Sequence, residues 1–324
     1  MAAAPRVLLL TDPAMAGHHS PGHPERPERL DAVTAGVTDG AAIARATLER
    51  AAVLPADRVA LARVHPDAYL ELLEDAARQG GGWIDADTHL GPDSMLAARM
   101  AAGATIQAAL AVARGEGTVA FAVVRPPGHH ARAERAAGFC LLNSMALAAM
   151  ALRAAGLARR IAIVDWDVHH GDGTQAIFDA DPDLCYASTH QMPLYPGSGD
   201  PAERGHGPGL GSMHNLPLAP GSGDEQFVAA WSGQLLPAVE AFAPEAILVS
   251  AGYDAHHLDP LAGLEVTSEG FRRVAEEVGG LARTLGLGGV AVTLEGGYDL
   301  GALREGAAST VVGLLAGLSG RVPS

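Results

Sequence analysis

The chain has 324 residues, of which 48% are hydrophobic and 18% charged, so it can fold around a sizeable core. It contains no lysine, which excludes chemistry that needs a lysine Schiff base or a P-loop lysine. Its net charge of −15 would repel phosphate groups, and we therefore expect no nucleic-acid partner.

Cysteine usage and the N-terminus bear on the compartment. Cys140 and Cys185 form no CxxC motif and are typical of buried thiols in a reducing cytoplasm. The first ten residues contain an apolar run but lack the layout of a signal peptide. We find no apolar stretch near the length of a membrane span and expect a cytoplasmic protein with no membrane partner. The alanine-rich composition suggests a bacterial source.

Short apolar runs alternate along the chain with longer segments of helical periodicity. The runs are rich in valine, isoleucine and leucine, as buried parallel strands are. The alternation predicts an α/β fold with a mostly parallel central sheet and helices on both faces. We expect strands at residues 7–10, 119–124, 161–164, 184–187, 247–250 and 290–294. The clearest helical segments are residues 92–114, 143–155, 224–242, 268–285 and 299–318.

Residues 15–27 and 189–220 show no periodicity and are rich in glycine, proline and histidine. We interpret both as long loops, which in compact domains are usually functional. No linker or repeat divides the chain, so residues 1–324 are predicted to form one domain.

Polar clusters follow four of the expected strands at their C-terminal ends. They comprise residues 126–130, residues 165–172, Asp254 and residues 295–298. That edge of an open parallel sheet is where ligands bind. Four distant segments should therefore converge on one site.

The segment DWDVHHGDG at residues 165–173 has the spacing of a metal site. Asp165, Asp167 and His169 alternate, so an extended chain would point all three the same way. A carboxylate and an imidazole on one face suit a divalent metal, and Asp254 is the natural third ligand. Zinc and ferrous iron both accept one histidine and two carboxylates.

The segments RPPGHH at residues 125–130 and EGGYD at residues 295–299 supply further reactive groups. His129 and His130 suit general acid–base work, because imidazole titrates near neutrality. Asp165 and Asp172 remain free to orient them, as in hydrolase sites. Tyr298, behind two glycines, can donate a hydrogen bond to a developing oxyanion.

Together these segments resemble the zinc-dependent histone deacetylase superfamily, which includes the bacterial acetylpolyamine amidohydrolases and acetoin-utilisation proteins. The match runs from HPERPERL at residues 23–30 to GGY at residues 296–298, in the same order, and is nearest to the class II-like branch. The resemblance implies the arginase/deacetylase fold and one deacetylase-like catalytic domain over residues 1–324. It implies an amidohydrolase that removes acetyl or other acyl groups from lysine side chains.

The resemblance also implies the ions and their ligands. The zinc ligands would be Asp167, His169 and Asp254. A structural potassium ion would be held by main-chain oxygens of Asp165, Asp167 and His169 and by the Ser188 hydroxyl. Arg29 matches an interior arginine that the family uses for product release.

Catalytic roles follow from the same resemblance. His130, paired with Asp172, would be the general base. His129, paired with Asp165, would orient the water and protonate the leaving amine. Tyr298 would polarise the scissile carbonyl and stabilise the tetrahedral intermediate.

Five positions match substrate-binding positions of the family. Gly138 and Phe139 would line the acyl-lysine tunnel, with Tyr195 in place of a second phenylalanine. Asp93 would grip the substrate at the rim. Leu261 stands where the polyamine-specific branch has an acidic residue, which favours an acyl-lysine protein or peptide over an acetylated polyamine or other small amine.

Two rival functions differ in kind. An arginase-like di-metal hydrolase could share the sheet, but it would need more bridging carboxylates than this sequence offers. A non-catalytic protein that binds acyl ligands would typically lack a metal ligand or the tyrosine. All of those residue types are present here.

Overall fold

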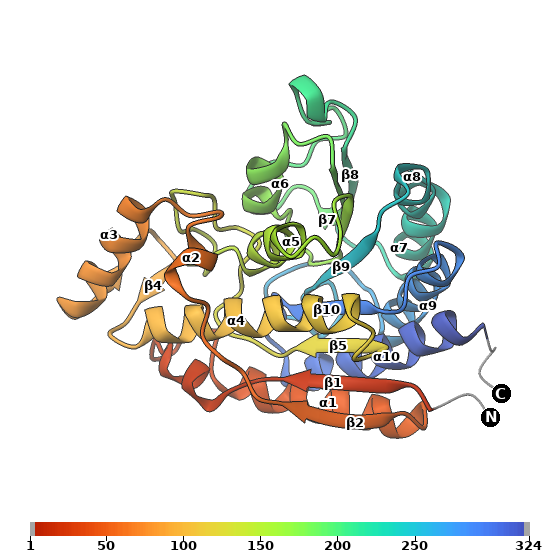
Figure 1. Cartoon of the computed structure of the whole chain (residues 1–324), viewed down its shortest axis with the longest axis horizontal. Coiled ribbons are helices and arrows are strands. Elements are labelled where there is room, and N and C mark those ends of the chain that lie inside the picture. Colours follow the sequence, from red (N-terminus) through yellow and green to blue (C-terminus); the bar gives the residue numbers. More distant parts are fainter. Residues whose placement is uncertain (1–3, 321–324) are drawn as a thin grey trace.

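The computed structural model describes residues 4–320 and contains one large parallel sheet. Its eight strands lie in the order β2-β1-β5-β10-β9-β6-β7-β8, and they fan from β2 at one edge to β8 at the other (Figure 1). Every neighbouring pair is parallel. The strands are β1 (Arg6–Leu10), β2 (Thr47–Ala51), β5 (Val119–Ala122), β6 (Ile161–Asp165), β7 (Leu184–Gln191), β8 (Met213–Leu218), β9 (Ala246–Ala251) and β10 (Val290–Leu294). The predicted α/β class is confirmed.

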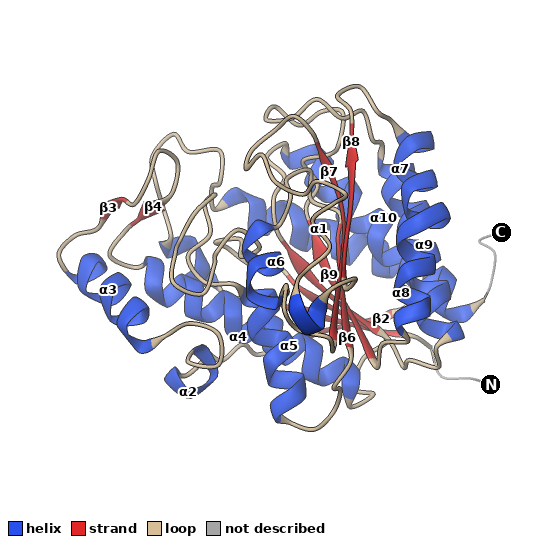
Figure 2. Cartoon of the chain, turned by 90° about the horizontal axis from the view of Figure 1, so that it is seen from above, coloured by secondary structure: helices blue, strands red, loops and turns tan. Residues whose placement is uncertain are grey.

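Helices cover both faces of this sheet (Figure 2). One face carries α4 (Ser94–Ala113), α5 (Ser144–Ala154) and α6 (Asp172–Phe178). The other carries α1 (Glu28–Ile43), α7 (Asp224–Ala230), α8 (Leu236–Phe242), α9 (Ser268–Thr284) and α10 (Leu300–Ser319). Beyond the sheet lie α2 (Arg58–Leu61), α3 (Asp67–Arg78) and the antiparallel hairpin of β3 (Gly82–Trp83) and β4 (His89–Leu90). The layered arrangement matches the sequence prediction.

The central strands are continuous apolar runs because helices bury them on both sides. Every residue of β5, β6 and β10 is buried, including Asp165 at the end of β6. In the sheet, β10 lies between β5 and β9, and β9 pairs with β6. The four strands that precede the polar clusters are therefore consecutive neighbours, which brings those clusters together.

The edge strands β2 and β8 differ from the sequence prediction. Strand β2 is exposed or half-buried along its length, so its sequence TLERA has no apolar run. Strand β8 lies inside the segment 189–220 that we expected to be loop, and half of its residues are only partly buried. Partial burial at a sheet edge removes the apolar pattern on which the prediction depends.

The predicted helix 224–242 is also interrupted. Between α7 and α8 the chain forms a π-helical segment, Trp231–Leu235, ahead of Pro237. Proline has no N–H to give to the preceding turn, so the regular hydrogen-bond ladder cannot run through it.

Helix α4 contains a longer apolar stretch than we expected of any segment. By length and hydropathy it could cross a bilayer, contrary to the expectation that no stretch approaches that length. However, 72% of its apolar window is buried inside the protein, where it packs against α5 and β5. Core helices of soluble proteins share these properties, so the apolarity of α4 is explained by its place in the fold.

Candidate active site

A cavity of about 220 Å³ opens where the polar clusters meet. Its walls come from the loops that follow β5, β6, β7, β9 and β10, and from the turn of the β3–β4 hairpin. The lining residues are Asp87, Pro127, His129, His130, Gly138, Phe139, His169, Leu194, Tyr195, Leu261, Gly296 and Tyr298. The convergence that the strand ends predicted is therefore present.

Asp167, His169 and Asp254 form the one group within residues 4–320 that could hold a metal ion. Their ligand atoms lie within 4.8 Å of one another. Nδ1 of His169 is 3.1 Å from Oδ1 of Asp167 and 3.2 Å from Oδ2 of Asp254. Tetrahedral ligands about 2.0–2.1 Å from a metal are separated by about 3.3 Å, so these spacings suit such a site.

The carboxylates of this group are arranged for a cation. Oδ2 of Asp254 is buried and accepts no hydrogen bond. Amides hold the other oxygens: Val168 N–H donates to Asp254 Oδ1 at 3.0 Å, and Gly296 N–H donates to Asp167 Oδ2 at 2.7 Å. Burial would lower the pKa of His169, but the two carboxylates raise it to about 10. Negative charge concentrated on a buried cluster favours a divalent ion there.

Two glycines make room for these carboxylates. A Cβ at Gly252 would overlap the Asp167 side chain, and one at Gly296 would overlap both Asp167 and Asp254. Only a residue without a side chain lets the backbone pass this close. The glycines in SAGYD and EGGYD therefore allow the backbone to lie against the carboxylates of the candidate metal site.

His129 is paired with Asp165. Its Nδ1 lies 3.1 Å from Asp165 Oδ2, which also accepts a hydrogen bond from Tyr186 Oη at 3.0 Å. Burial lowers the pKa of His129, but the carboxylates of Asp167 and Asp165 outweigh it and raise the pKa well above the ordinary value. This imidazole is therefore suited to carry a proton.

His130 is paired with Asp172, whose carboxylate also binds Arg132. Nδ1 of His130 lies 3.0 Å from Asp172 Oδ1, while Arg132 donates to Asp172 Oδ2 at 2.9 and 3.1 Å. Burial and the neighbouring His129 lower the pKa of His130 to about 3. A neutral imidazole fixed through Nδ1 leaves Nε2 free to accept a proton.

Tyr298 lines the same cavity and is 7% exposed. Burial, followed by the charge of Asp254, raises the pKa of its hydroxyl well above 10, so the group remains a proton donor. The guanidinium of Arg29 lies 5.2 Å from the centre of the tyrosine ring. Arg29 is fully buried on α1, where it contacts the carbonyls of Gly297 and Glu295.

Four of the predicted substrate-binding residues line the cavity: Gly138, Phe139, Tyr195 and Leu261. The Phe139 ring packs edge-on against Tyr298 at 5.8 Å, and the Tyr195 ring packs edge-on against His130 at 5.1 Å. The backbone turns sharply at Gly138 and Phe139, which both have positive φ. The two aromatic rings thus approach the reactive groups from different loops.

Asp93 differs from its predicted place at the rim. It is an exposed residue at the start of α4 and is not among the residues that line the cavity. The aspartate among the lining residues is Asp87, whose backbone carbonyl contacts His23 Nε2 at 3.1 Å. Both aspartates lie in polar turns without periodicity, so sequence pattern alone could not separate them.

Other partners of the site residues were not predicted from the sequence. Glu295 accepts hydrogen bonds from the amides of Gly128 at 2.6 Å and His129 at 3.1 Å, which fixes the loop that carries the histidine pair. Burial raises the pKa of Glu295 to about 7, against the opposing charge of His129. Tyr186 and Arg132 likewise act on Asp165 and Asp172. These contacts join distant segments and leave no local signal in the sequence.

Ser188 is fully buried at the predicted monovalent-cation position. It lies opposite Asp165 in the register of β6 and β7, and its Oγ is 3.0 Å from Nδ1 of His190. Nε2 of His190 lies 2.9 Å from the Gly199 carbonyl, which can only accept. His190 therefore carries its proton on Nε2 and accepts the Ser188 proton at Nδ1. The lone pairs of Ser188 Oγ remain available to a cation.

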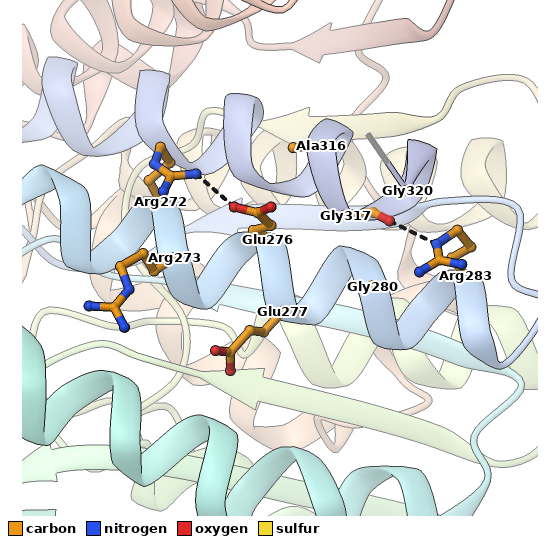
Figure 3. A pocket seen from close by; sticks show the side chains of 9 residues that line it. All are labelled: Arg272, Arg273, Glu276, Glu277, Gly280, Arg283, Ala316, Gly317 and Gly320. Atoms are coloured by element: carbon orange, nitrogen blue, oxygen red, sulfur yellow. Dashed lines mark hydrogen bonds and ion pairs between the residues drawn. The ribbon is translucent and has the colours of Figure 1, made fainter. Parts of the chain in front are cut away.

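A surface cavity of about 480 Å³ lies elsewhere, between α9 and α10 (Figure 3). Two of its arginines are engaged with the protein itself. Arg272 pairs with Glu276 at 2.7 Å, and Arg283 donates to the Gly317 carbonyl at 3.1 Å. No histidine or tyrosine lines it, so the reactive groups belong to the smaller cavity.

Known proteins resemble this chain over most of its length. The histone deacetylase domain model matches residues 23–314. A probable deacetylase of Archaeoglobus fulgidus is 42% identical over 93% of this chain and 82% of the relative. A histone deacetylase-like amidohydrolase of Pseudomonas aeruginosa is 38% identical over 92% of this chain and 78% of the relative. A crystal structure of the HDA15 HD domain, 34% identical, covers 94% of this chain and 89% of that chain, with a TM-score of 0.87.

Proposed function

Because this chain belongs to the histone deacetylase family, we propose that it removes acetyl or other acyl groups from lysine side chains by metal-dependent hydrolysis. The family comprises deacetylases that hydrolyse amide bonds, and this chain is an enzyme of that class. We further propose that residues 1–324 act as one catalytic domain.

One observation supports the proposal most strongly. A metal-binding group, two histidine–carboxylate pairs and a protonated tyrosine are gathered about one cavity. Amide hydrolysis needs a nucleophilic water, a base to take its proton, an acid for the leaving amine and a donor for the oxyanion. The cavity has a side chain for each task.

The division of labour follows from the surroundings of each group. A divalent metal held by Asp167, His169 and Asp254 would polarise the acyl carbonyl and lower the pKa of a bound water from about 15.7 towards 7. His130 is fixed to Asp172 through Nδ1, so Nε2 takes the proton of the attacking water. The His129–Asp165 pair then gives a proton to the leaving amine.

Tyr298 completes the site by stabilising negative charge on the former carbonyl oxygen. Its hydroxyl stays protonated because burial raises its pKa. A donor placed where charge develops contributes most in a cavity that excludes water. Phe139 and Tyr195 supply apolar walls for the acyl-lysine stem.

We propose zinc as the metal and potassium as the structural cation. One imidazole and two carboxylates suit zinc, and ferrous iron fits the same donors. For potassium, the support is the buried pair of Asp165 and Ser188 and the orientation that His190 gives to the serine hydroxyl. We propose a cytoplasmic location for the enzyme, in keeping with its two free, buried cysteines.

The rim favours acyl-lysine peptides over acetylated polyamines. Leu261 lines the cavity and is 37% exposed, so the mouth presents an apolar side chain there. A second ammonium group would gain nothing from that contact, whereas an uncharged peptide backbone would not be repelled. Acetylated small amines remain the second candidate substrate class.

The experiment compares kcat/KM for an acetyl-lysine peptide and an N-acetylated polyamine. We expect the peptide to be preferred by about 10-fold or more, and Leu261→Glu to move the ratio towards the polyamine by a similar factor. Leu258→Glu is the matched control, because Leu258 is 51% exposed on the same loop and does not line the cavity. A wild-type preference for the polyamine would replace lysine as the proposed substrate class.

A further inference from the structure

The peptide group between Gly297 and Tyr298 is held at both ends by hydrogen bonds to buried side chains, those of Arg29 and Asp259. The Gly297 carbonyl accepts a hydrogen bond from Nε of Arg29 at 2.6 Å. The Tyr298 amide donates to Oδ2 of Asp259, also at 2.6 Å. Arg29 is fully buried and Asp259 is 7% exposed, so water competes little for either contact.

The two hydrogen bonds stabilise the same orientation of this peptide. A trans peptide points its carbonyl and its N–H in opposite directions and carries a dipole of about 3.5 D. The guanidinium faces the negative end of that dipole and the carboxylate faces the positive end. Gly297 has a φ of +110° and no side chain, so local sterics restrict the backbone least at this residue. The two hydrogen bonds therefore restrict rotation of the peptide at a residue where backbone sterics restrict it weakly.

The Asp259 carboxylate also joins two loops of the site. Its Oδ1 accepts from the Leu261 amide at 3.0 Å, and its backbone N–H donates to the His256 carbonyl at 2.8 Å. The loop after β9 carries the rim leucine, and the loop after β10 carries the tyrosine. One buried carboxylate, bound by backbone amides, thus fixes both loops relative to each other.

We propose that Asp259 is a positioning residue for deacetylation. Its carboxylate binds the N–H of the Gly297–Tyr298 peptide while Arg29 binds the carbonyl of the same peptide. Together they hold the tyrosine hydroxyl where it donates to the substrate carbonyl. The inference rests on the role proposed above for Tyr298. Asp259 is not one of the three metal-binding residues, so its loss should slow the chemical step and spare metal affinity.

The first test compares Asp259→Asn with Asp224→Asn. The asparagine side chain would keep the size of the aspartate but lose its charge and one acceptor. Asp224 is a matched control: it accepts from the Thr267 amide at 2.7 Å and hydroxyl at 2.6 Å and does not line the cavity. On an acetyl-lysine peptide, Asp259→Asn should lower kcat about 10-fold or more, with KM and metal affinity within about twofold of wild type.

A double-mutant cycle separates positioning of the tyrosine from general disruption. A trifluoroacetyl-lysine peptide, whose carbonyl is more reactive, keeps the rate of Tyr298→Phe measurable. If Asp259 acts through the tyrosine hydroxyl, the loss from Asp259→Asn should fall below about twofold in the Tyr298→Phe background. An equal loss in both backgrounds would show a structural effect and overturn the inference.

Amide hydrogen exchange at Tyr298 gives a readout that does not depend on activity. Exchange should be faster in Asp259→Asn than in wild type or Asp224→Asn, and unchanged exchange would contradict the proposal. Failure of the positioning role proposed for Asp259 can be distinguished from failure of the catalytic role proposed for Tyr298. Full activity in Tyr298→Phe would overturn the role of the tyrosine. If Tyr298→Phe is slow but Asp259→Asn is as active as Asp224→Asn, only the positioning role of Asp259 is overturned.

Discussion

Two adjacent histidines acquire different proton affinities because their surroundings differ. His129 faces Asp165 and Asp167, which favour its protonated form. Burial and the neighbouring His129 lower the pKa of His130 more than Asp172, which also pairs with Arg132, raises it. The same residue type is thereby suited to two tasks, one as a proton donor and one as a base.

The pH dependence of activity should reflect the low proton affinity of His130. A general base works in its neutral form, and a pKa lowered to about 3 keeps it neutral well below the ordinary histidine value of 6.5. The acid limb of the kcat/KM profile should therefore lie clearly below pH 6.5. Removing Arg132 restores the full charge of Asp172, favours the imidazolium and should move that limb to higher pH by about 0.5–1 unit.

The control is Arg135→Ala, in the same loop as Arg132. The pH profile of this variant should match that of wild type, because Arg135 does not pair with Asp172. An acid limb at or above pH 6.5 in wild type, or no shift in Arg132→Ala, would refute this assignment of the base.

Two kinds of contact fix the loops around the site: close packing of glycine backbone against side chains, and buried ion pairs. Gly296 brings the loop after β10 against the carboxylates of Asp167 and Asp254. Glu25 joins the loop before α1 to the segment after β5, because it binds Arg29 at 2.8 Å and Arg125 at 2.6 Å. Gly296 and Glu25 both lie outside the helices and strands, yet both help to determine where the reactive side chains are held.

Gly296→Ala should weaken metal binding by about 10-fold or more. The added Cβ would overlap the carboxylates of Asp167 and Asp254, which must then move apart. Competition with a chelator measures the effect on the dissociation constant. Gly280→Ala on α9, where a Cβ meets nothing within 4 Å, is the control and should bind metal as wild type does. Equal affinity in the two variants would mean that this glycine is not needed for the site.

The buried ion pairs of Glu25 with Arg29 and Arg125 should contribute to the free energy of unfolding in a pH-dependent way. Burial would raise the pKa of Glu25, but Arg125 and Arg29 lower it from 4.5 to about 2. A lowered folded-state pKa gives stability that is present above pH 4.5 and lost as the pH falls towards 2, amounting to about 3 kcal/mol.

Urea unfolding checks this linkage by comparing wild type with Glu25→Gln, which leaves two buried arginines without their carboxylate. The variant should be less stable by about 3–5 kcal/mol at pH 7, and the difference should shrink at pH 3. A difference that is the same at both pH values would exclude ionisation of Glu25 as its source.

For the whole molecule, the sequence predicted those features that leave a regular pattern of apolar or polar residues along the chain. The central strands are predictable because helices cover both of their faces. The proximity of Asp167 and His169, which could hold a metal ion, is predictable because the two residues alternate after such a strand. Strands β2 and β8 were missed because edge strands are only partly buried. Long-range packing, which no local pattern encodes, determines that Asp87 and not Asp93 lines the cavity. The same holds for the contact of Asp259 with Tyr298.

The most direct test of this account measures amine release from an acetyl-lysine peptide while metal-stripped protein is titrated with zinc. A single group of three ligands predicts that activity returns in proportion to zinc and saturates near one ion per chain. Asp254→Ala should abolish this response. Saturation only at two ions per chain, or stoichiometric zinc binding without any amine release, would contradict a single-metal lysine deacetylase.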